Sequence, residues 1–188
     1  MDLLTPLLQR RSTPSRLLSA PGPDDAQLHR MLTAAVHVPD HGRLAPWRFI
    51  AIRGEQRRRL GELLAHRRIE REPDAAAAVV DKDRQRFDHA PLVVVVVARL
   101  SPGHKIPEQE QLLSGGAACF SLLLAADALG FGAQWLTGWA AYDPVVSESL
   151  GLADGECTLG FIHVGTRTAE VPDRERPSIA NLLSEANL

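Results

Sequence analysis

The chain has 188 residues, 45% of them hydrophobic and 23% charged, which is ordinary for a globular protein and suits one domain spanning residues 1–188. A formal net charge of -2 argues against binding to nucleic acid, and the longest apolar run, Pro91 to Ala98, is too short to span a membrane, so neither is predicted as a partner. The two cysteines, Cys119 and Cys157, have no CxxC spacing and suit a reducing compartment, so we predict a cytoplasmic protein.

The first predicted element is a short helix whose apolar stripe runs from Leu3 to Leu8, with Asp2 as its N-cap. Arg10 and Arg11 fall in its last turn, before Ser12 and Pro14 end it. Basic residues at a helix end interact favourably with the helix dipole, and that alone would explain the two arginines. Together with the Ser12 hydroxyl, they are also suited to binding a phosphate through charge-assisted, bidentate hydrogen bonds.

A second helix is predicted from its N-cap, Asp24, to the residues before Pro39. A polar loop containing His41 leads into a strand at residues 48–52, and such loops at the edge of a scaffold often carry binding groups. His41 can donate a hydrogen bond to a phosphate oxygen. His37 lies four residues earlier, but Pro39 prevents the helix that would align the two histidines on a metal, so we predict no metal site.

The middle of the chain is rich in charge. After Gly54 the sequence predicts a charged helix, and residues 67–85 have few large apolar side chains, so we expect a solvated helical segment with Asp74 as a cap. Its arginines are balanced by glutamates, which is more typical of a solvated helix face than of a nucleic-acid patch. By contrast, residues 92–98 are apolar without alternation, which predicts a central strand covered by helices on both faces.

A long helix is predicted over residues 108–129, with Gly130 as its stop. Its small residues 114–118 allow close approach of another helix or of a flat ligand, and helix packing would explain most of them. A short strand, residues 132–136, is then broken at Thr137-Gly138. Within this stretch Trp135 offers an aromatic wall, and the break offers exposed backbone amides.

The remaining elements are a helix beginning at Asp143-Pro144, a strand at residues 158–164, and a polar tail with an amphipathic piece at residues 179–186. Helices and strands alternate without a strict βαβ repeat. The sequence therefore predicts a mixed α and β class, with one sheet layer between helices.

Several common catalytic motifs are missing. There is no GxxxxGK[ST] and no GxSxG, and Gly130-Phe131-Gly132 precedes a strand and lacks the third glycine of a dinucleotide fingerprint. No nucleophile or general-base pair stands out, so we predict no catalytic side chain. The polar groups that remain suit a flat, phosphorylated cofactor that carries the chemistry itself.

A series of short motifs then occurs in the order found in one known family. They are Arg10-Arg11-Ser12, Pro39-Asp40-His41, Pro46-Trp47-Arg48-Phe49, Ala90-Pro91-Leu92, His104-Lys105-Ile106-Pro107, Glu110-Gln111, Ser114-Gly115-Gly116, Leu129-Gly130-Phe131-Gly132, Trp135 with Thr137-Gly138, Gly160-Phe161 and Gly165-Thr166. Each is weak alone, but together they cover nearly the whole chain. On these motifs the chain resembles the FMN-dependent nitroreductase family, and in particular its compact single-domain bacterial NAD(P)H nitroreductases.

The resemblance implies an α+β fold, a three-layer α/β/α sandwich with a mixed, mostly antiparallel sheet. It also implies an intertwined homodimer with two FMN molecules at the subunit interface. The residues matched to the cofactor fall into four groups. Arg10, Arg11 and Ser12 would hold the phosphate; His37 and His41 would contact FMN; Trp135, Leu136, Thr137 and Gly138 would lie beside the flavin ring, where amides tune its N5 edge; and Arg176, or alternatively Arg174, would also reach the phosphate.

Three departures from the family pattern are visible. His37 and Leu136 stand where close relatives commonly carry arginine, and residues 40–44 replace a loop that often holds serine and asparagine. The choice between NADH and NADPH and the physiological acceptor therefore stay open.

The implied reaction is ping-pong. NAD(P)H would deliver hydride to the flavin and leave, and a small aromatic acceptor such as a nitroaromatic or quinone would then be reduced. Two alternatives stay open: a flavin protein of the same fold with a different reaction or no turnover, and an interaction domain that binds no flavin.

Overall fold

Strand β3, Leu92–Arg99, forms the centre of the molecule, and every residue in it except Arg99 is buried. The computed structural model describes residues 4–186, and these form a five-stranded sheet. The other strands are β1 Leu18–Ser19, β2 Trp47–Arg53, β4 Gly132–Leu136 and β5 Glu156–Arg167. Their order is β1-β5-β3-β2, β4 also pairs with β5, and every pairing in the described chain is antiparallel.

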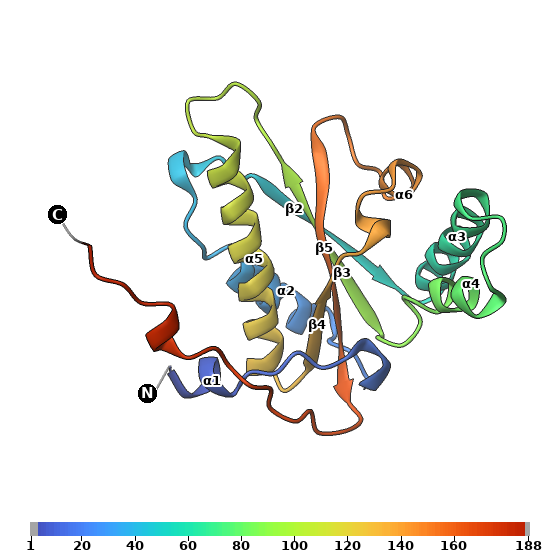
Figure 1. Cartoon of the computed structure of the whole chain (residues 1–188), viewed down its shortest axis with the longest axis horizontal. Coiled ribbons are helices and arrows are strands. Elements are labelled where there is room, and N and C mark those ends of the chain that lie inside the picture. The colour runs from blue at the N-terminus through green and yellow to red at the C-terminus, as the bar shows by residue number, and fades with distance from the viewer. Residues whose placement is uncertain (1–3, 187–188) are drawn as a thin grey trace.

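Helices cover both faces of this sheet (Figure 1). They are α1 Leu4–Gln9, α2 Asp25–Ala35, α3 Glu55–Arg71, α4 Ala77–Arg84, α5 Glu108–Ala128 and α6 Pro144–Ser149. Val94 and Val96 of β3 pack against α2 and α5, whereas Val93, Val95 and Val97 pack against α3 and α6. Each buried valine contributes about 1.5–3 kcal/mol, so β3 requires both layers. The predicted three-layer sandwich is present.

The loop predicted to carry binding groups is held firmly between α2 and β2. Asp24 caps α2 through a reciprocal capping box with Gln27, as the sequence predicts. Beyond the helix, the Asp40 carboxylate accepts hydrogen bonds from two backbone amides of the loop. The indole of Trp47 donates to the Ser114 hydroxyl at 3.1 Å, and that hydroxyl donates in turn to the carbonyl of residue 39. These bonds tie the loop to α5.

The charged segment at residues 67–85 differs from the prediction. Helix α3 continues to Arg71, and α4 begins at Ala77 with Ala76 at its N-cap, so the predicted capping by Asp74 is wrong. Nor is the segment merely solvated, because Asp83 is 4% exposed and lies 2.7 Å from the Arg68 guanidinium. The sequence shows the charges but not which of them pair across the helices.

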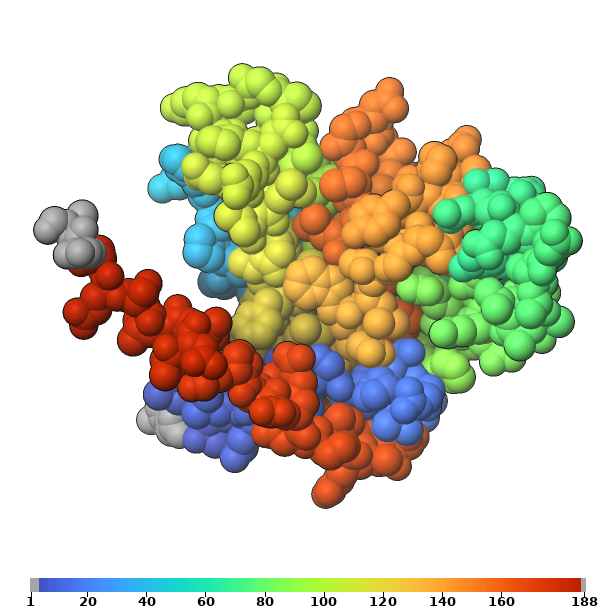
Figure 2. All heavy atoms as spheres, viewed as in Figure 1, coloured from blue at the N-terminus to red at the C-terminus, as the bar shows by residue number. Residues whose placement is uncertain are grey.

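The termini also depart from expectation in detail. Helix α1 ends at Gln9, so Arg10 and Arg11 follow the helix instead of lying in its last turn. The predicted N-cap, Asp2, and Leu3 lie outside the described residues. The predicted amphipathic piece near the C-terminus contains only a 3-10 turn, Ile179–Asn181, and the chain from there to residue 186 extends away from the body (Figure 2). Its apolar side chains, Ile179, Leu182 and Leu183, are therefore exposed in the described part of the chain.

Helix α5 is apolar and long enough, by composition alone, to be a membrane span. Eight of its 21 residues are buried within this structure.

A neutral histidine lies within the core beneath α3. His163 of β5 has no exposed surface, and its ring stacks on Phe87 with centroids 5.6 Å apart. Neither ring nitrogen has a hydrogen-bond partner among the described residues. Burial, and then the charges of Arg86 and His89, lower the pKa of His163 to about 3.

This histidine predicts a pH-dependent stability. Between pH 6.5 and about 3 a histidine in the unfolded chain is protonated, whereas His163 in the folded chain stays neutral. The free energy of unfolding therefore falls as the pH falls through that window. His163→Phe removes the titration and keeps the stacking on Phe87. We expect the difference in the free energy of unfolding, variant minus wild type, to be about 2 kcal/mol larger at pH 5 than at pH 8. Urea denaturation at both pH values measures this, and an equal gain at both would contradict it.

Candidate functional site

An arginine cluster forms where the chain leaves α1. The Arg10 guanidinium lies 3.3 Å from the Ser12 hydroxyl and sits over the ring of Phe120 on α5. Arg11 pairs with Asp173 at 2.5 Å, and Arg176 reaches the same carboxylate at 3.3 Å. The two ends of the chain therefore meet here, and the structure brings together Arg10, Arg11, Ser12 and Arg176.

The electrostatics of this cluster favour an anion. Burial, and then the nearby charge of Arg176, lower the pKa of Arg10, and Arg174 acts in the same direction more weakly. Of the two arginines that the sequence left open, Arg176 therefore exerts the stronger influence on Arg10. The guanidinium groups of Arg11 and Arg176 share the carboxylate of Asp173, and Arg10 adds a third positive charge nearby, so the cluster keeps an excess of positive charge that suits a phosphate.

The segment after the cluster runs along the outer edge of β4. The Thr13 amide donates to the Ala133 carbonyl at 2.9 Å, and the Ser15 amide donates to the Gln134 side chain at 2.6 Å. These two bonds place the arginine cluster beside the same sheet edge that carries residues 135–138. In the sequence the two stretches are connected only through the family resemblance, since they lie more than 120 residues apart.

The end of β4 presents an aromatic ring and an unpaired amide. Trp135 is 37% exposed, and its indole donates to the Leu159 carbonyl while lying over Gly160. Gly138 has φ 72° and ψ -172°, a conformation that only glycine adopts easily. Among the described residues, the Gly138 amide has no hydrogen-bond acceptor. It is therefore available to a ligand.

A basic cleft that the sequence did not predict opens beside Leu136, on the α4 side of β4. It has a volume of about 660 Å³; Arg16, Lys82 and Arg86 bring positive charge to its lining, against the single carboxylate of Asp81. Arg86 donates to the Thr137 carbonyl at 2.7 Å. The sequence carried no recognisable sign of this role, because these cations lie in stretches that look like ordinary solvated helix.

His37 and His41 lie apart from the arginine cluster. His41 Nδ1 lies 2.6 Å from the Glu110 carboxylate at the N-terminal end of α5, whereas Arg10 sits over Phe120, ten residues and about 15 Å further along the helix. His37 lies just after α2, and its ring donates to the Thr33 carbonyl of that helix. Figure 1 shows the loop after α2 and helix α1 beside opposite ends of α5. Within a single chain, therefore, His37 and His41 do not lie beside the arginine cluster.

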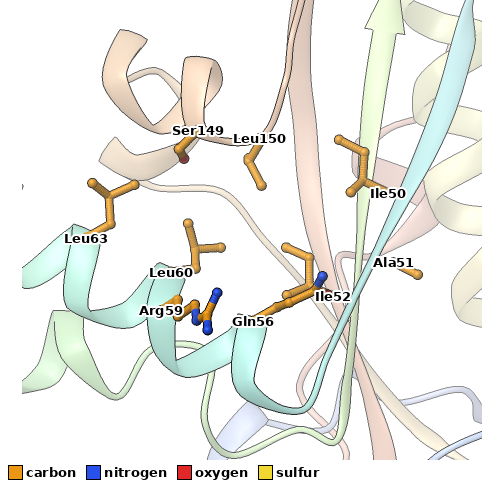
Figure 3. A pocket seen from close by; sticks show the side chains of 9 residues that line it. All are labelled: Ile50, Ala51, Ile52, Gln56, Arg59, Leu60, Leu63, Ser149 and Leu150. Carbon is orange, nitrogen blue, oxygen red and sulfur yellow. The ribbon is translucent and has the colours of Figure 1, made fainter.

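A different hollow lies between β2, α3 and α6, where Leu60, Leu63 and Leu150 converge (Figure 3). Its volume is about 300 Å³, its walls are mainly aliphatic, and none of the predicted site residues lines it. It is therefore not the site that the sequence indicated.

Helix α5 also presents an apolar surface to solvent. Leu113 is 66% exposed and Phe120 is 43% exposed. At Gly116 between them, no atom of the described residues outside the backbone of α5 lies within 4 Å of the position where a Cβ would stand. We call Leu112, Leu113, Gly116 and Phe120 the outer face of α5. Exposed apolar surface of this kind marks an interaction site in soluble proteins.

The sequence matches the Nitroreductase family over residues 7–166. It is 39% identical over 166 residues to the Escherichia coli protein named "Putative NAD(P)H nitroreductase YdjA", and the match covers 88% of each chain.

Solved structures show the same fold. The nitroreductase-like family protein from Bacillus cereus superposes with a TM-score of 0.81 at 22% identity, covering 99% of this chain and 96% of that one. A nitroreductase with bound FMN from Bacteroides fragilis superposes with a TM-score of 0.74 at 19% identity and full coverage of both chains. The predicted fold and family resemblance are confirmed.

Gly138 gives a prediction about the site. An added Cβ would stand 2.7 Å from the Arg86 guanidinium, which would have to leave the Thr137 carbonyl. Losing that charge-assisted bond costs about 1.5–3 kcal/mol. Gly151 also has a positive φ, of 68°, but open space around it. We expect Gly138→Ala to lower the free energy of unfolding by about 1–3 kcal/mol more than Gly151→Ala, as measured by urea denaturation.

The excess should fall when both substitutions are compared in an Arg86→Met background, because the bond to the Thr137 carbonyl is then already absent. An excess that is unchanged there would show that backbone strain at Gly138, and not the Arg86 contact, sets the cost.

Proposed function

The chain belongs to the nitroreductase family of oxidoreductases, and we propose that it is an FMN-dependent NAD(P)H oxidoreductase that reduces electron-poor acceptors such as nitroaromatics and quinones. The observation that carries this proposal is the shared sheet edge, where the arginine cluster adjoins the unpaired amide of Gly138 through the Thr13 bond to β4. A phosphate group at one end and a flat ring at the other match these two features.

The residues present fit FMN. Arg10, Ser12 and Arg176, with Arg11 beside them, would hold the phosphate by charge-assisted hydrogen bonds. The flat ring would lie beside residues 135–138, with the Gly138 amide as a donor toward its N5 edge. When bound, FMN supplies the chemistry by accepting two electrons and a proton as hydride and passing them on.

The chain's own contribution would be binding, orientation and electrostatics. NAD(P)H and the acceptor would use one surface of the cofactor in turn, which is a ping-pong order. No acid or base from a side chain is needed, and stacking of flat molecules would be the main recognition. We therefore expect broad acceptor specificity, with nitro compounds and quinones as convenient examples.

We also propose that the working form is an intertwined homodimer with FMN at the interface. The outer face of α5 is apolar and exposed, and in a symmetric dimer it would pack against its own copy. The exposed Ile179, Leu182 and Leu183 of the projecting tail would find cover on the second subunit. His37 and His41, which one chain keeps away from its own arginine cluster, would then contact the cofactor held by the partner.

The first test is the absorbance spectrum of the purified protein saturated with FMN. We expect flavin bands that bleach when NADH or NADPH is added without oxygen, and that return when a nitroaromatic or a quinone follows. A chain that takes up no FMN would refute the proposal. Tight FMN that neither nucleotide reduces would favour a flavin-binding protein without this turnover.

Arg10→Gln should weaken FMN binding because it removes a charge-assisted bond to the phosphate. We expect the dissociation constant to rise about 10- to 100-fold, as measured by quenching of FMN fluorescence. Arg58→Gln is the matched control, since Arg58 lies exposed on α3 and pairs with Glu55. An equal effect of the two substitutions would contradict the phosphate role.

The shared site predicts complementation between subunits. Arg10→Gln and His41→Ala should each weaken both sites of a homodimer. In a heterodimer of the two variants, one site carries both defects and the other carries neither. We expect the purified heterodimer to bind one FMN with wild-type affinity. If instead no tight site is regained, the two residues belong to the same chain's site, and a chain that stays monomeric would also refute the proposal.

A further inference from the structure

We infer that Arg86 is a positioning residue that fixes and polarises the peptide between Thr137 and Gly138, and that it thereby raises the reduction potential of the cofactor bound there. This inference rests on the proposed function, because it concerns the FMN ring beside residues 135–138. Arg86 lies outside the set of residues that the sequence indicated.

The contact is direct. Arg86 Nη2 donates to the Thr137 carbonyl at 2.7 Å. That carbonyl belongs to the same peptide unit as the Gly138 amide, which has no acceptor among the described residues. A charged donor on the oxygen of a peptide draws electron density from its nitrogen and strengthens the N–H as a donor, because chains of hydrogen bonds polarise one another.

Arg86 is itself held in place from the side of α3 and α4. Asp83 lies 4.0 Å from the Arg86 guanidinium and is fixed by Arg68 at 2.7 Å and by the indole of Trp139 at 3.3 Å. The ring of Trp139 in turn lies against the guanidinium groups of Arg68 and Arg71. Because Trp139 directly follows Gly138, one network anchors both the peptide and the arginine that binds it.

The charge on Arg86 is poorly neutralised. Its Nε is buried with no partner in the described part of the chain, and its nearest carboxylate, Asp83, already serves Arg68. Burial is the largest of the effects that lower the Arg86 pKa, although an arginine remains charged at any physiological pH. A partly desolvated positive charge acts over several ångströms with little screening.

These features favour the reduced cofactor over the oxidised one. Reduction adds electron density to the ring, and a polarised amide donor at its edge together with a fixed positive charge behind that amide stabilise the added density. Removing the charge while keeping the side-chain length should therefore lower the midpoint potential. A purely structural role would change stability or FMN affinity and leave the potential where it was.

The test compares Arg86→Met, Arg86→Lys and the matched control Arg84→Met, all saturated with FMN. Arg84 lies on α4 two residues earlier and pairs with Glu62 and Asp81. Midpoint potentials are measured by equilibration with a reference dye. We expect R86M to shift the ratio of reduced to oxidised FMN at least tenfold toward the oxidised form, about 30 mV for a two-electron couple. R86K should recover at least half of that shift, and R84M should stay within threefold of wild type.

A second measurement needs no FMN. Thr137-Gly138 is the only Thr-Gly pair in the sequence, so apoprotein labelled with [1-13C]threonine and [15N]glycine gives one resonance for this peptide. We expect the Gly138 amide proton to move upfield in R86M and to stay near its wild-type position in R84M. If R86M does not fold, the same two measurements compare R86K with wild type, and a change in the same direction is expected.

Failure of the inference and failure of the proposed function look different. Wild-type protein that binds no FMN, or whose FMN is not reduced by NAD(P)H, refutes the proposed function, whatever the amide does. The role of Arg86 is overturned if wild-type protein passes that test and the ratio of reduced to oxidised FMN in R86M stays within threefold of the wild-type ratio. An R86K shift as large as that of R86M, or an unmoved Gly138 amide, overturns it as well.

Discussion

The burial of β3 on both faces is the constraint on which the rest of the structure depends. A strand with seven consecutive buried residues has no face to offer solvent, so helices must cover the sheet on each side. Once α2 and α5 take one face and α3 and α6 the other, the free surfaces that remain are the sheet edges and the outer sides of the helices. The candidate site is built on one such edge, at the end of β4, where the Gly138 amide has no acceptor among the described residues.

The charged helices α3 and α4 also hold the end of β4 in place. Surface ion pairs usually contribute little, but Asp83 is buried and receives hydrogen bonds from Arg68 and Trp139. Removing one partner of such a buried group is costly, so the network holds its geometry. It ends on the Thr137 carbonyl through Arg86, which makes α3 and α4 a rigid frame for the end of β4.

Much of this arrangement was accessible from the sequence, and the exceptions have a common cause. Three local features are predicted by the sequence: the valine run, the Asp24 cap and the break at Thr137-Gly138. Each depends only on the hydrophobic pattern, the capping residue or the turn residues within a few positions of the chain. β1 was missed because its two residues form a strand only by pairing with the end of β5. Arg86 was missed because its partner lies 51 residues away, and no local pattern separates a guanidinium that faces solvent from one that binds a distant carbonyl.

The two adjacent glycines of α5 show how a single helix serves both the core and the proposed assembly. At Gly115 an added Cβ would stand 2.3 Å from Leu159, so this glycine lets the helix approach the sheet. At Gly116 the same atom would meet nothing, so packing within the chain does not explain the absence of a side chain there. A glycine on an exposed apolar helix face costs about 1 kcal/mol relative to alanine and returns nothing to an isolated subunit. Close contact with a second α5 would use that space, and the same contact would carry His41 of one subunit toward the arginine cluster of the other.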